Sequence, residues 1–391
     1  MSRLLLFNPD NDLALASGLS HYMAPRNARL IREAGQALPL WWADEGDVVA
    51  SANSAYLEEI IDRFNLNGTI MSDPTSIDEA MPWGWSLAAK TDIAALEVAP
   101  SALPDDDKLA AIRALSHRRV SIEINSRLAD LGFTTPPLPA EARDAKELKA
   151  SLAALGDSYI KAPWSSSGRG VLPTASMNID EISRRAVGII ERQGSVMIEK
   201  ALAKKLDFAM LFHIDGPLTA FKGLSLFNNT RSTAYAGNIV APQSRIDKAI
   251  STVVGNEKLA PLAGALETIL ADVVRDNYKG WAGIDMMAYT DDNGATAIAP
   301  CVELNLRMTM GCVALTLAQK HLAECSEGSM TVAFRRQSPS SQLVDPQDTT
   351  LQPDVVIADG KLVEGAVEMT PPNPHFSFRF EARQNDKGPV V

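Results

Sequence analysis

The segment 301–311, CVELNLRMTMG, places an acid, an amide and a guanidinium at alternate positions of the chain. The alternation of Glu303, Asn305 and Arg307 with apolar residues predicts a strand with one buried face and one polar face. Carboxylate and amide oxygens are ligands that Mg²⁺ prefers, and arginine stabilises charge that develops on a phosphoryl group. The polar face of this strand therefore predicts a site for metal and phosphate.

A further carboxylate is expected beside this strand. The segment 283–289, GIDMMAY, is also typical of a strand, and the linker TDDNGAT contains the Asn-Gly pair that favours a tight hairpin. In such a hairpin Asp285 projects beside Glu303 and Asn305, and these three residues are the candidate metal ligands. The alternative is a surface ladder of ion pairs in which Glu303 and Arg307 neutralise each other.

The segment YIKAPWSSSGRGV predicts a place for phosphate groups. A strand that ends at Lys161 runs into a loop of small residues, whose exposed backbone N–H groups can surround phosphate oxygens while the lysine supplies a positive charge. The loop candidates are Ser165, Ser166, Ser167, Gly168 and Gly170. The alternative is an ordinary surface turn, because serine and glycine are common in turns.

The segment 196–208, VMIEKALAKKLDF, has residue types that a nucleoside needs. A purine needs an acceptor for its amino group, and a ribose needs a carboxylate for its hydroxyl groups. The candidates for these roles are Glu199, Lys200, Leu202 and Asp207. The alternative is a solvated cluster of charges between two strands.

Several common nucleotide and hydrolase motifs are missing from the sequence. Gly168 and Gly170 form a G-x-G, but Pro173 stands where a dinucleotide fingerprint has its third glycine. The sequence also lacks G-x-x-x-x-G-K-[ST], H-E-x-x-H and G-x-S-x-G. These absences disfavour a Rossmann cofactor site, a P-loop, a zincin and an α/β-hydrolase.

Length and charge restrict the class of protein. The 391 residues exceed what one ordinary core accommodates, so we expect two or three domains. The formal net charge of −11 offers no basic surface to nucleic acid and disfavours an anionic membrane, so neither is an expected partner. The three cysteines lack metal-ligand spacing and are expected to be reduced, and no leader or membrane-spanning stretch is recognised. We expect a cytoplasmic protein.

The chain changes character twice along its length. Strand and helix patterns alternate over residues 1–115, which predicts an α/β domain with a mostly parallel sheet. Residues 116–330 begin with two helical segments and continue with strands in an α+β pattern. Residues 331–391 are polar at first and then β-rich, which predicts a small C-terminal appendage with a frayed tail.

The order of the motifs resembles that of the ATP-grasp superfamily, which includes D-alanine:D-alanine ligase, biotin carboxylase and carbamoyl-phosphate synthetase. The Lys161 strand with its Ser/Gly loop is followed by IEKAL, Lys222, GIDMM and ELNLR, as in that family. The resemblance covers roughly residues 116–325. It implies an α/β pre-grasp domain followed by a two-subdomain ATP-grasp fold, whose lid subdomain spans about 135–200.

The resemblance also implies how a nucleotide would bind. Lys161 corresponds to the lysine on the α and β phosphates, and residues 165–170 correspond to the mobile loop that closes over the triphosphate. The candidates between residues 199 and 207 correspond to the adenine hinge and then to the ribose carboxylate. Arg118 or Arg119 corresponds to the basic residue that precedes the helix leading into the grasp domain.

Metal and catalytic roles follow from the same resemblance. Asp285, Glu303 and Asn305 correspond to the ligands of a pair of Mg²⁺ ions, for which Mn²⁺ is the alternative ion. Arg307 corresponds to the arginine that stabilises the phosphoryl intermediate, and Lys222 to a contact of the γ-phosphate. These last two are the predicted catalytic residues.

The implied reaction joins a small carboxylate to an amine or another nucleophile. ATP phosphorylates the carboxylate, and the nucleophile attacks the acylphosphate to release ADP and phosphate. A phosphotransferase with a stable phosphorylated product and a regulatory module that binds nucleotide without turnover stay open as alternatives. A homodimer is common in the family and also stays open.

The loop after the first strand is the candidate acceptor site, because ligands of open α/β sheets lie beyond the carboxyl ends of strands. Asn-Pro turns and Asp caps are also ordinary structural features, which is the alternative interpretation. Trp83 and Trp85 are candidates for a wall of the same cleft, and Arg231 with Tyr235 for another anion site. The loop candidates are Asn8, Asp10, Asn11, Asp12, His21, Tyr22 and Arg26.

Overall fold

The computed structural model describes residues 2–71, 77–165, 170–229, 235–335 and 354–384. Its N-terminal part contains a parallel sheet in the order β3-β2-β1-β4, which confirms the sheet predicted from the alternating pattern. The carboxyl end of β1 faces the loop that carries the predicted acceptor residues. The strands are β1 (Arg3–Leu6), β2 (Val48–Val49), β3 (Thr69–Ile70) and β4 (Glu79–Pro82).

Two helices of the N-terminal part, α3 and α4, begin at side-chain caps. The hydroxyl groups of Ser54 and Ser86 accept hydrogen bonds from backbone N–H groups in the first turns of α3 and α4. The apolar segment Leu38–Trp41 is a 3₁₀-helix and not a strand; its Pro39 lacks the N–H that a strand ladder needs. The helices are α1 (Asn11–Ser17), α2 (Arg26–Ala34), α3 (Ala55–Phe64), α4 (Leu87–Ala94) and α5 (Asp106–Leu115).

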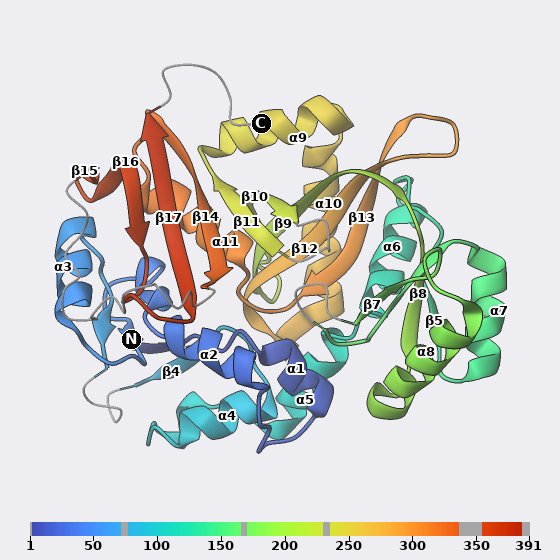
Figure 1. Cartoon of the computed structure of the whole chain (residues 1–391), viewed down its shortest axis with the longest axis horizontal. Helices are drawn as coiled ribbons and strands as arrows, with labels where there is room; N and C mark the ends of the chain where they lie inside the picture. The colour runs from blue at the N-terminus through green and yellow to red at the C-terminus, as the bar shows by residue number, and fades with distance from the viewer. Residues whose placement is uncertain (1, 72–76, 166–169, 230–234, 336–353, 385–391) are drawn as a thin grey trace.

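A small antiparallel sheet and two helices form a unit, over residues 140–200, that is called the lid. Its strand order is β5-β8-β6-β7, and Ile160, Ala186 and Ile198 lie in a core of its own. This unit lies at the right of Figure 1, joined to the rest by α6 (Val120–Asp130). Its elements are β5 (Ala140–Ala142), α7 (Ala145–Leu155), β6 (Ser158–Lys161), β7 (Val171–Pro173), α8 (Ile179–Gln193) and β8 (Val196–Lys200).

The largest sheet runs through the rest of the chain in the order β13-β12-β9-β10-β11-β14-β17-β16-β15. Helices α9 (Gln243–Val254) and α10 (Leu259–Val274) share an apolar core with β9, β12 and β13. The β-rich C-terminal segment is thus continuous with this sheet. Its strands are β9 (Ala203–Asp215), β10 (Ala220–Asn229), β11 (Tyr235–Val240), β12 (Lys279–Thr290), β13 (Thr296–Asn305), β14 (Ser326–Phe334), β15 (Val356–Ala358), β16 (Lys361–Glu368) and β17 (Phe376–Gln384).

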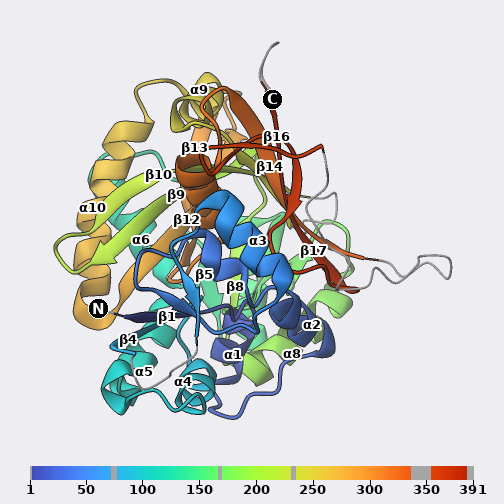
Figure 2. The same ribbon diagram turned by 90° about the vertical axis from the view of Figure 1, so that its left-hand side faces the viewer.

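The N-terminal part and the C-terminal strands share one core. Phe7 packs edge-on against Phe378 with ring centroids 5.7 Å apart, and Trp41 Nε1 donates a hydrogen bond to the Met369 carbonyl at 2.7 Å. The Tyr56 hydroxyl of α3 likewise donates to the Glu368 carbonyl at 2.6 Å. Figure 2 shows α3 beside these strands. Phe378 and Phe380 alternate along β17 and are both buried on the same face.

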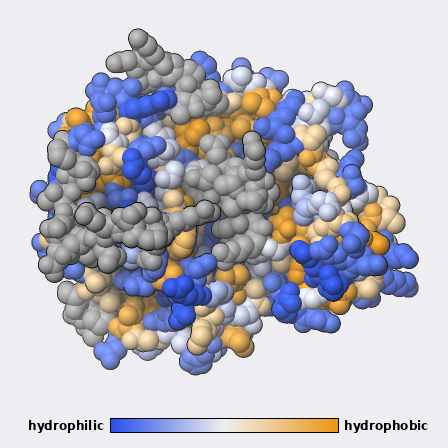
Figure 3. Space-filling view, in the orientation of Figure 1, coloured by the Kyte–Doolittle hydropathy of each residue, from blue (hydrophilic) through white to orange (hydrophobic). Residues whose placement is uncertain are grey.

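The surface is mixed in character over the face seen in Figure 1. Hydrophilic and hydrophobic residues are interspersed there, and hydrophilic residues gather over the lid helix α8 (Figure 3). Among the described residues, no helix combines the length and the apolar character that a bilayer crossing requires.

Candidate active site

Two carboxylates lie side by side on the hairpin of β12 and β13. Asp285 is paired directly opposite Glu303, and opposed residues of antiparallel strands project to the same face. Asn305 projects to that face too, because side chains alternate along a strand, and its hydrogen bond lowers the pKa of Asp285 against the larger effect of burial. The structure therefore brings the three predicted metal ligands together.

Arg118, which precedes α6, closes one side of this cluster. Its Nη1 lies 2.8 Å from Glu303 Oε2, and the Arg118 side chain is only 7% exposed. Its other nitrogens donate hydrogen bonds to the Ala162 carbonyl at 3.1 Å and the Ser165 hydroxyl at 3.3 Å. Arg118 thus joins the hairpin to the segment after Lys161, whereas the half-exposed Arg119 does not take part in these contacts.

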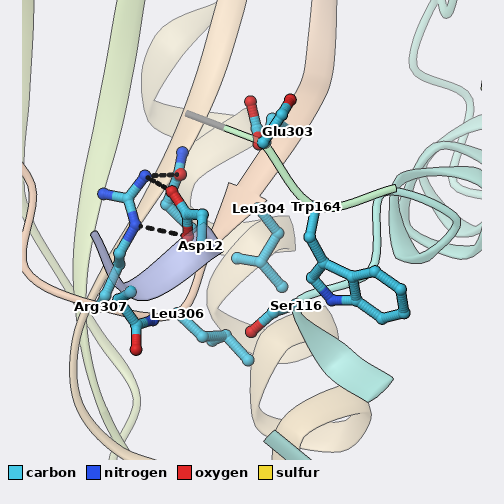
Figure 4. Close-up of a pocket in the computed structure, with 10 residues that line it drawn as sticks. Asp12, Ser116, Trp164, Glu303, Leu304, Leu306 and Arg307 are labelled. Atoms are coloured by element: carbon cyan, nitrogen blue, oxygen red, sulfur yellow. Dashed lines mark hydrogen bonds and ion pairs between the residues drawn. The ribbon is translucent and has the colours of Figure 1, made fainter. Parts of the chain in front are cut away.

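Arg307 joins the other side of the cluster to the N-terminal part. Its Nε and Nη2 donate hydrogen bonds to the two carboxylate oxygens of Asp12 at 3.0 and 2.8 Å. Nη2 also donates to Asn305 Oδ1 at 2.8 Å, as the dashed lines in Figure 4 show. This two-point contact fixes the plane of the guanidinium. A small cavity beside it is lined from four parts of the chain by Asn11, Asp12, Ser116, Trp164, Ser165 and residues 303–307.

The electrostatics of the two hairpin carboxylates fit a divalent cation. Burial raises the pKa of Asp285, and the charge of Glu303 raises it further. Burial also raises the pKa of Glu303, while Arg118 opposes that shift. A cation between such groups relieves their repulsion, and two carboxylates with an amide oxygen suit Mg²⁺. The described residues contain no group of three or more His, Cys, Asp or Glu that could hold a metal, so phosphate and water would complete the coordination.

Lys161 lies in the lid sheet and faces the hairpin. Its ammonium group forms an ion pair with Glu199 across β6 and β8, and both side chains are mostly buried. Lys161 is among the cations that lower the pKa of Glu303 against the effect of burial. Burial raises the pKa of Cys301 on β13, with Asp285 and then Glu199 adding to that shift. The lid residues and the hairpin residues therefore share one electrostatic environment.

The other charged nucleotide candidates lie at the edge of this environment. Lys200 Nζ is 3.3 Å from Asp292 Oδ2, at the exposed turn of the hairpin. Lys204 Nζ lies 2.6 Å from Asp207 Oδ2, and the Asp207 side chain is largely buried. Lys200 and Asp207 each form an ion pair, and their nucleoside roles stay predictions.

Leu202 contributes to a small apolar surface. It packs, half-buried, with Met287, Tyr289 and Val302 of the hairpin. Met287 and Val302 are only partly buried, so this surface is partly open. An apolar surface of this kind suits the face of a purine ring.

The Ser/Gly loop is described at its two ends. Ser165 is buried and accepts the hydrogen bond from Arg118. Gly170 has a φ of +75°, a conformation that glycine adopts without strain, and its carbonyl accepts the Ala162 N–H at 3.0 Å. Ser166, Ser167 and Gly168 lie outside the described residues.

Lys222 lies on an exposed part of β10. There its charge adds to the effect of burial in lowering the pKa of His213 on the neighbouring strand. The cations that act most strongly on Glu303 are Arg118, Arg307 and Lys161. The structure does not bring Lys222 into this set, and its contact with the γ-phosphate stays a prediction.

A larger cavity of about 350 Å³ lies beside the first one. The predicted acceptor residues that line it are Asn8, Asp10, Asn11, His21 and Tyr22. Asn8 is held there by hydrogen bonds to both backbone groups of Gly84, at 2.8 and 3.3 Å. Asn11 lines both cavities, which places the second cavity next to Arg307.

Other acceptor candidates lie elsewhere. Arg26, at the start of α2, is not among the residues that line either cavity. Trp83 is buried edge-on against Phe7 with centroids 5.1 Å apart, so it is part of the core. Arg231 and the side chain of Tyr235 lie outside the described part of the chain.

Three charged residues line the larger cavity without having been predicted. Arg29 and Arg32 come from α2 and Asp92 from α4, and Arg32 Nη2 lies 2.7 Å from Asp92 Oδ2. The sequence carries a signal for the arginines, because positions 26, 29 and 32 are spaced by three and share one side of a helix. No local pattern signals Asp92, whose position depends on how α2 and α4 pack.

Neither a protein-family model nor a curated protein matches this sequence. Solved structures do match. A biotin carboxylase-beta-gamma-ATP complex from Campylobacter jejuni has a TM-score of 0.52 at 13% identity, over 97% of this chain and 86% of that one. A phosphoribosylamine–glycine ligase from Thermotoga maritima also has a TM-score of 0.52, at 14% identity, over 99% and 93% of the two chains.

The chain has the ATP-grasp fold. The fold class predicted from the order of the motifs is therefore confirmed. At this level of identity the likeness extends to the fold, and the chemistry depends on the side chains described above.

Proposed function

We propose that this ATP-grasp protein is an ATP- and Mg²⁺-dependent ligase that joins a carboxylate to an amine through an acylphosphate. One observation carries the proposal: Asp285 and Glu303 converge between Arg118 on the lid side and Arg307 on the N-terminal side. This arrangement offers ligands for a metal and a fixed cation for a phosphoryl group in a single place.

Each half of the fold contributes to binding of the nucleotide. Lys161 binds phosphate oxygens as a positive charge, and the apolar surface at Leu202 takes the adenine ring. Asp207 accepts hydrogen bonds from the ribose hydroxyl groups. Asp285, Glu303 and Asn305 would hold Mg²⁺, which neutralises phosphate charge and orients the γ-phosphate when it is bound.

Arg307 has the central role in phosphoryl transfer. A carboxylate oxygen of the substrate attacks the γ-phosphorus, and the bond from phosphorus to the ADP oxygen breaks. Arg307, whose plane is fixed by Asp12, stabilises the charge on the phosphoryl oxygens. Arg118, Glu303 and Arg307 are mostly buried, and this limits the access of water to the acylphosphate.

Hydroxylamine allows the first half of the reaction to be tested without knowing the acceptor. The full chain is supplied with ATP, Mg²⁺, hydroxylamine and a panel of small carboxylic acids, and hydroxamate, ADP and phosphate are measured. Formation of a hydroxamate with stoichiometric ADP and phosphate supports the acylphosphate route. A stable phosphorylated product would identify a phosphotransferase, and ATP binding without ADP release would identify a regulatory module.

A pair of lysine variants tests the nucleotide site. Lys161→Met is expected to weaken ATP binding by roughly 10- to 100-fold, because a charge-assisted hydrogen bond contributes about 1.5–3 kcal/mol. Lys149→Met removes the same charge from an exposed position of α7 and should leave ATP affinity unchanged. Equal ATP affinities of the two variants in calorimetry would contradict the assignment.

A further inference from the structure

The larger cavity contains charged groups that the nucleotide site does not use. It lies at the carboxyl end of β1, and Asn11 is part of both its wall and the wall of the Arg307 cavity. Its volume of about 350 Å³ is in the range of small-molecule sites. A molecule bound there lies next to the place where an acylphosphate forms.

Asp10 is the buried charge of this cavity. The residue is 6% exposed, and its Oδ1 has no hydrogen-bond partner among the described residues. Burial raises the pKa of Asp10, Arg32 opposes the shift, and Asp92 and Asp12 add to it. A buried carboxylate oxygen without a donor is unfavourable by itself. Asp10 lines the cavity, so a positively charged group of a ligand bound there would compensate the charge of the buried carboxylate.

Positive charge lies toward the rim of the same cavity. Arg32 is paired with Asp92, whereas the exposed Arg29 guanidinium has no ion pair or hydrogen bond with the described residues. The Tyr22 side chain is half-buried close enough to Asp10 for that carboxylate to raise its pKa, in addition to the effect of burial. The cavity therefore offers an anion at depth and a cation toward the opening.

We propose that this cavity binds the acceptor of the ligase, and that the acceptor carries both an amine and a carboxylate, as a free amino acid does. The amine binds Asp10, and the carboxylate binds Arg29. This inference rests on the proposed ligase function, and it adds the chemical class of the nucleophile.

Asp10 also has a place in the proton transfers of this reaction. The Asp10 carboxylate accepts one proton from the ammonium group, and the freed lone pair forms the C–N bond to the acyl carbon. The C–O bond to phosphate breaks, and the departing phosphate takes a further proton from nitrogen. One N–H remains on the amide, and Asp10 returns its proton to water after the product leaves.

Binding of amino acids to the full chain tests this inference. The probes are the twenty common L-amino acids, their N-acetyl derivatives and their carboxamides, with Mg²⁺ and a non-hydrolysable ATP analogue present, observed by ligand-detected NMR. At least one free amino acid is expected to bind, while its N-acetyl and carboxamide derivatives do not. Absence of binding by every free amino acid, or equal binding by the blocked derivatives, would overturn the inference.

Variants of the two charges locate the site. Asp10→Asn and Arg29→Gln are each expected to weaken binding of that amino acid by roughly 10- to 100-fold through loss of a charge-assisted hydrogen bond. Arg26→Gln is the matched control, because Arg26 is exposed on the same helix and does not line the cavity. If Asp10→Asn does not fold, the amino-acid affinity of Arg29→Gln still tests the inference. Unchanged affinity in the folded cavity variants would overturn the inference.

The hydroxylamine assay separates this inference from the proposed function. Hydroxylamine attacks an acylphosphate without an acceptor site, so the wild-type chain is expected to form hydroxamate whether or not the cavity binds an amino acid. Hydroxamate formation without amino-acid binding would overturn the acceptor class and leave the ligase function standing. Failure of wild-type hydroxamate formation would overturn the ligase function itself.

Discussion

Two neighbouring regions of this molecule hold their charges in opposite ways. Around the hairpin, Glu303 is paired with Arg118, Arg307 with Asp12 and Lys161 with Glu199. In the adjacent cavity, Asp10 Oδ1 lacks a partner, and Arg29 is in no ion pair with the described part of the chain. The two regions meet at Asn11, which lines both cavities.

This difference shows which charged groups have partners within the protein and which are left for a ligand to pair with. The hairpin charges are held in place by partners before any nucleotide arrives, and such preorganisation suits phosphoryl transfer. In the cavity, Asp10 and Arg29 would gain their partners only when a substrate binds. Unpaired charges lower the stability of the fold, but they favour binding of molecules that carry the matching charges, as expected for a specificity site.

The largest effect is expected where the two regions are joined, at Arg307. Arg307→Ala should lower kcat by roughly 10² to 10³, as for removal of a preorganised donor to a developing charge. The measurement is steady-state hydroxamate formation at saturating ATP. Asp12→Asn is the control, because it keeps Arg307 but removes the charge that fixes its plane, and a smaller loss is expected. Unchanged kcat in Arg307→Ala would remove Arg307 from the chemistry.

The next largest effect is expected at the metal ligands of the hairpin. Removal of Mg²⁺ with EDTA should abolish turnover, and Asp285→Asn should raise the Mg²⁺ concentration needed for half-maximal activity more than roughly tenfold. The reason is that loss of a ligand costs more than loss of an outer contact, which typically costs 10- to 100-fold in affinity. A titration of activity against Mg²⁺ provides the measurement. An unaltered Mg²⁺ dependence would exclude Asp285 as a ligand.

Arg118 tests whether the hairpin charges depend on their partners. Arg118→Met leaves Glu303 without its cation, and the free energy of unfolding is expected to fall by about 1–3 kcal/mol. Arg119→Met, at the next and more exposed position, should change it by less than about 0.5 kcal/mol. Urea unfolding of both variants provides the comparison. Equal stability of the two would mean that Glu303 does not need Arg118.

The smallest effect is expected in the cavity at Asp10. There a substitution should raise the free energy of unfolding, whereas Arg118→Met should lower it. Asp10→Asn should raise the free energy of unfolding by about 1 kcal/mol at pH 7, because it removes a buried charge with an unpartnered oxygen. Burial raises the folded-state pKa of Asp10, so stability is lost as the pH rises through that value. The difference between variant and wild type should therefore vanish below about pH 4 and grow toward neutrality. Urea unfolding at both pH values measures it, and a destabilised variant at pH 7 would contradict the contrast.

The sequence predicts the hairpin site well because its signals are local. The Asn-Gly pair predicts the turn between β12 and β13, and alternation along the strands predicts that Asp285, Glu303 and Asn305 share a face. A register shift between Asp285 and Met287, which the sequence does not signal, sets the pairing of Asp285 with Glu303. Lys161 could be placed for the same reason, at the end of a short strand before a loop of small residues. The alternation along a strand and the end of a strand before a loop depend mainly on neighbouring residues, so they can be predicted from the sequence.

Pairs between distant parts of the chain could not be predicted in this way. The contact of Arg307 with Asp12 joins residues 295 positions apart, and no local pattern distinguishes Asp12 from its neighbours. Arg118 and Arg119 are adjacent and chemically equal, so only the packing of α6 selects one of them. The Asp10 cavity likewise depends on how α2 and α4 approach β1, which is a property of the tertiary structure.

The contact between Phe7 and Phe378 has a consequence for how the chain is made. A polypeptide emerges from the ribosome with Phe7 first, and the ring that covers it follows more than three hundred and fifty residues later. Until then the carboxyl end of β1, together with Asp10 and Asp12, stands over an incomplete core. The apolar face around Phe7 therefore lacks its β17 cover during nearly the whole of translation, and it gains that cover only when β17 is synthesised.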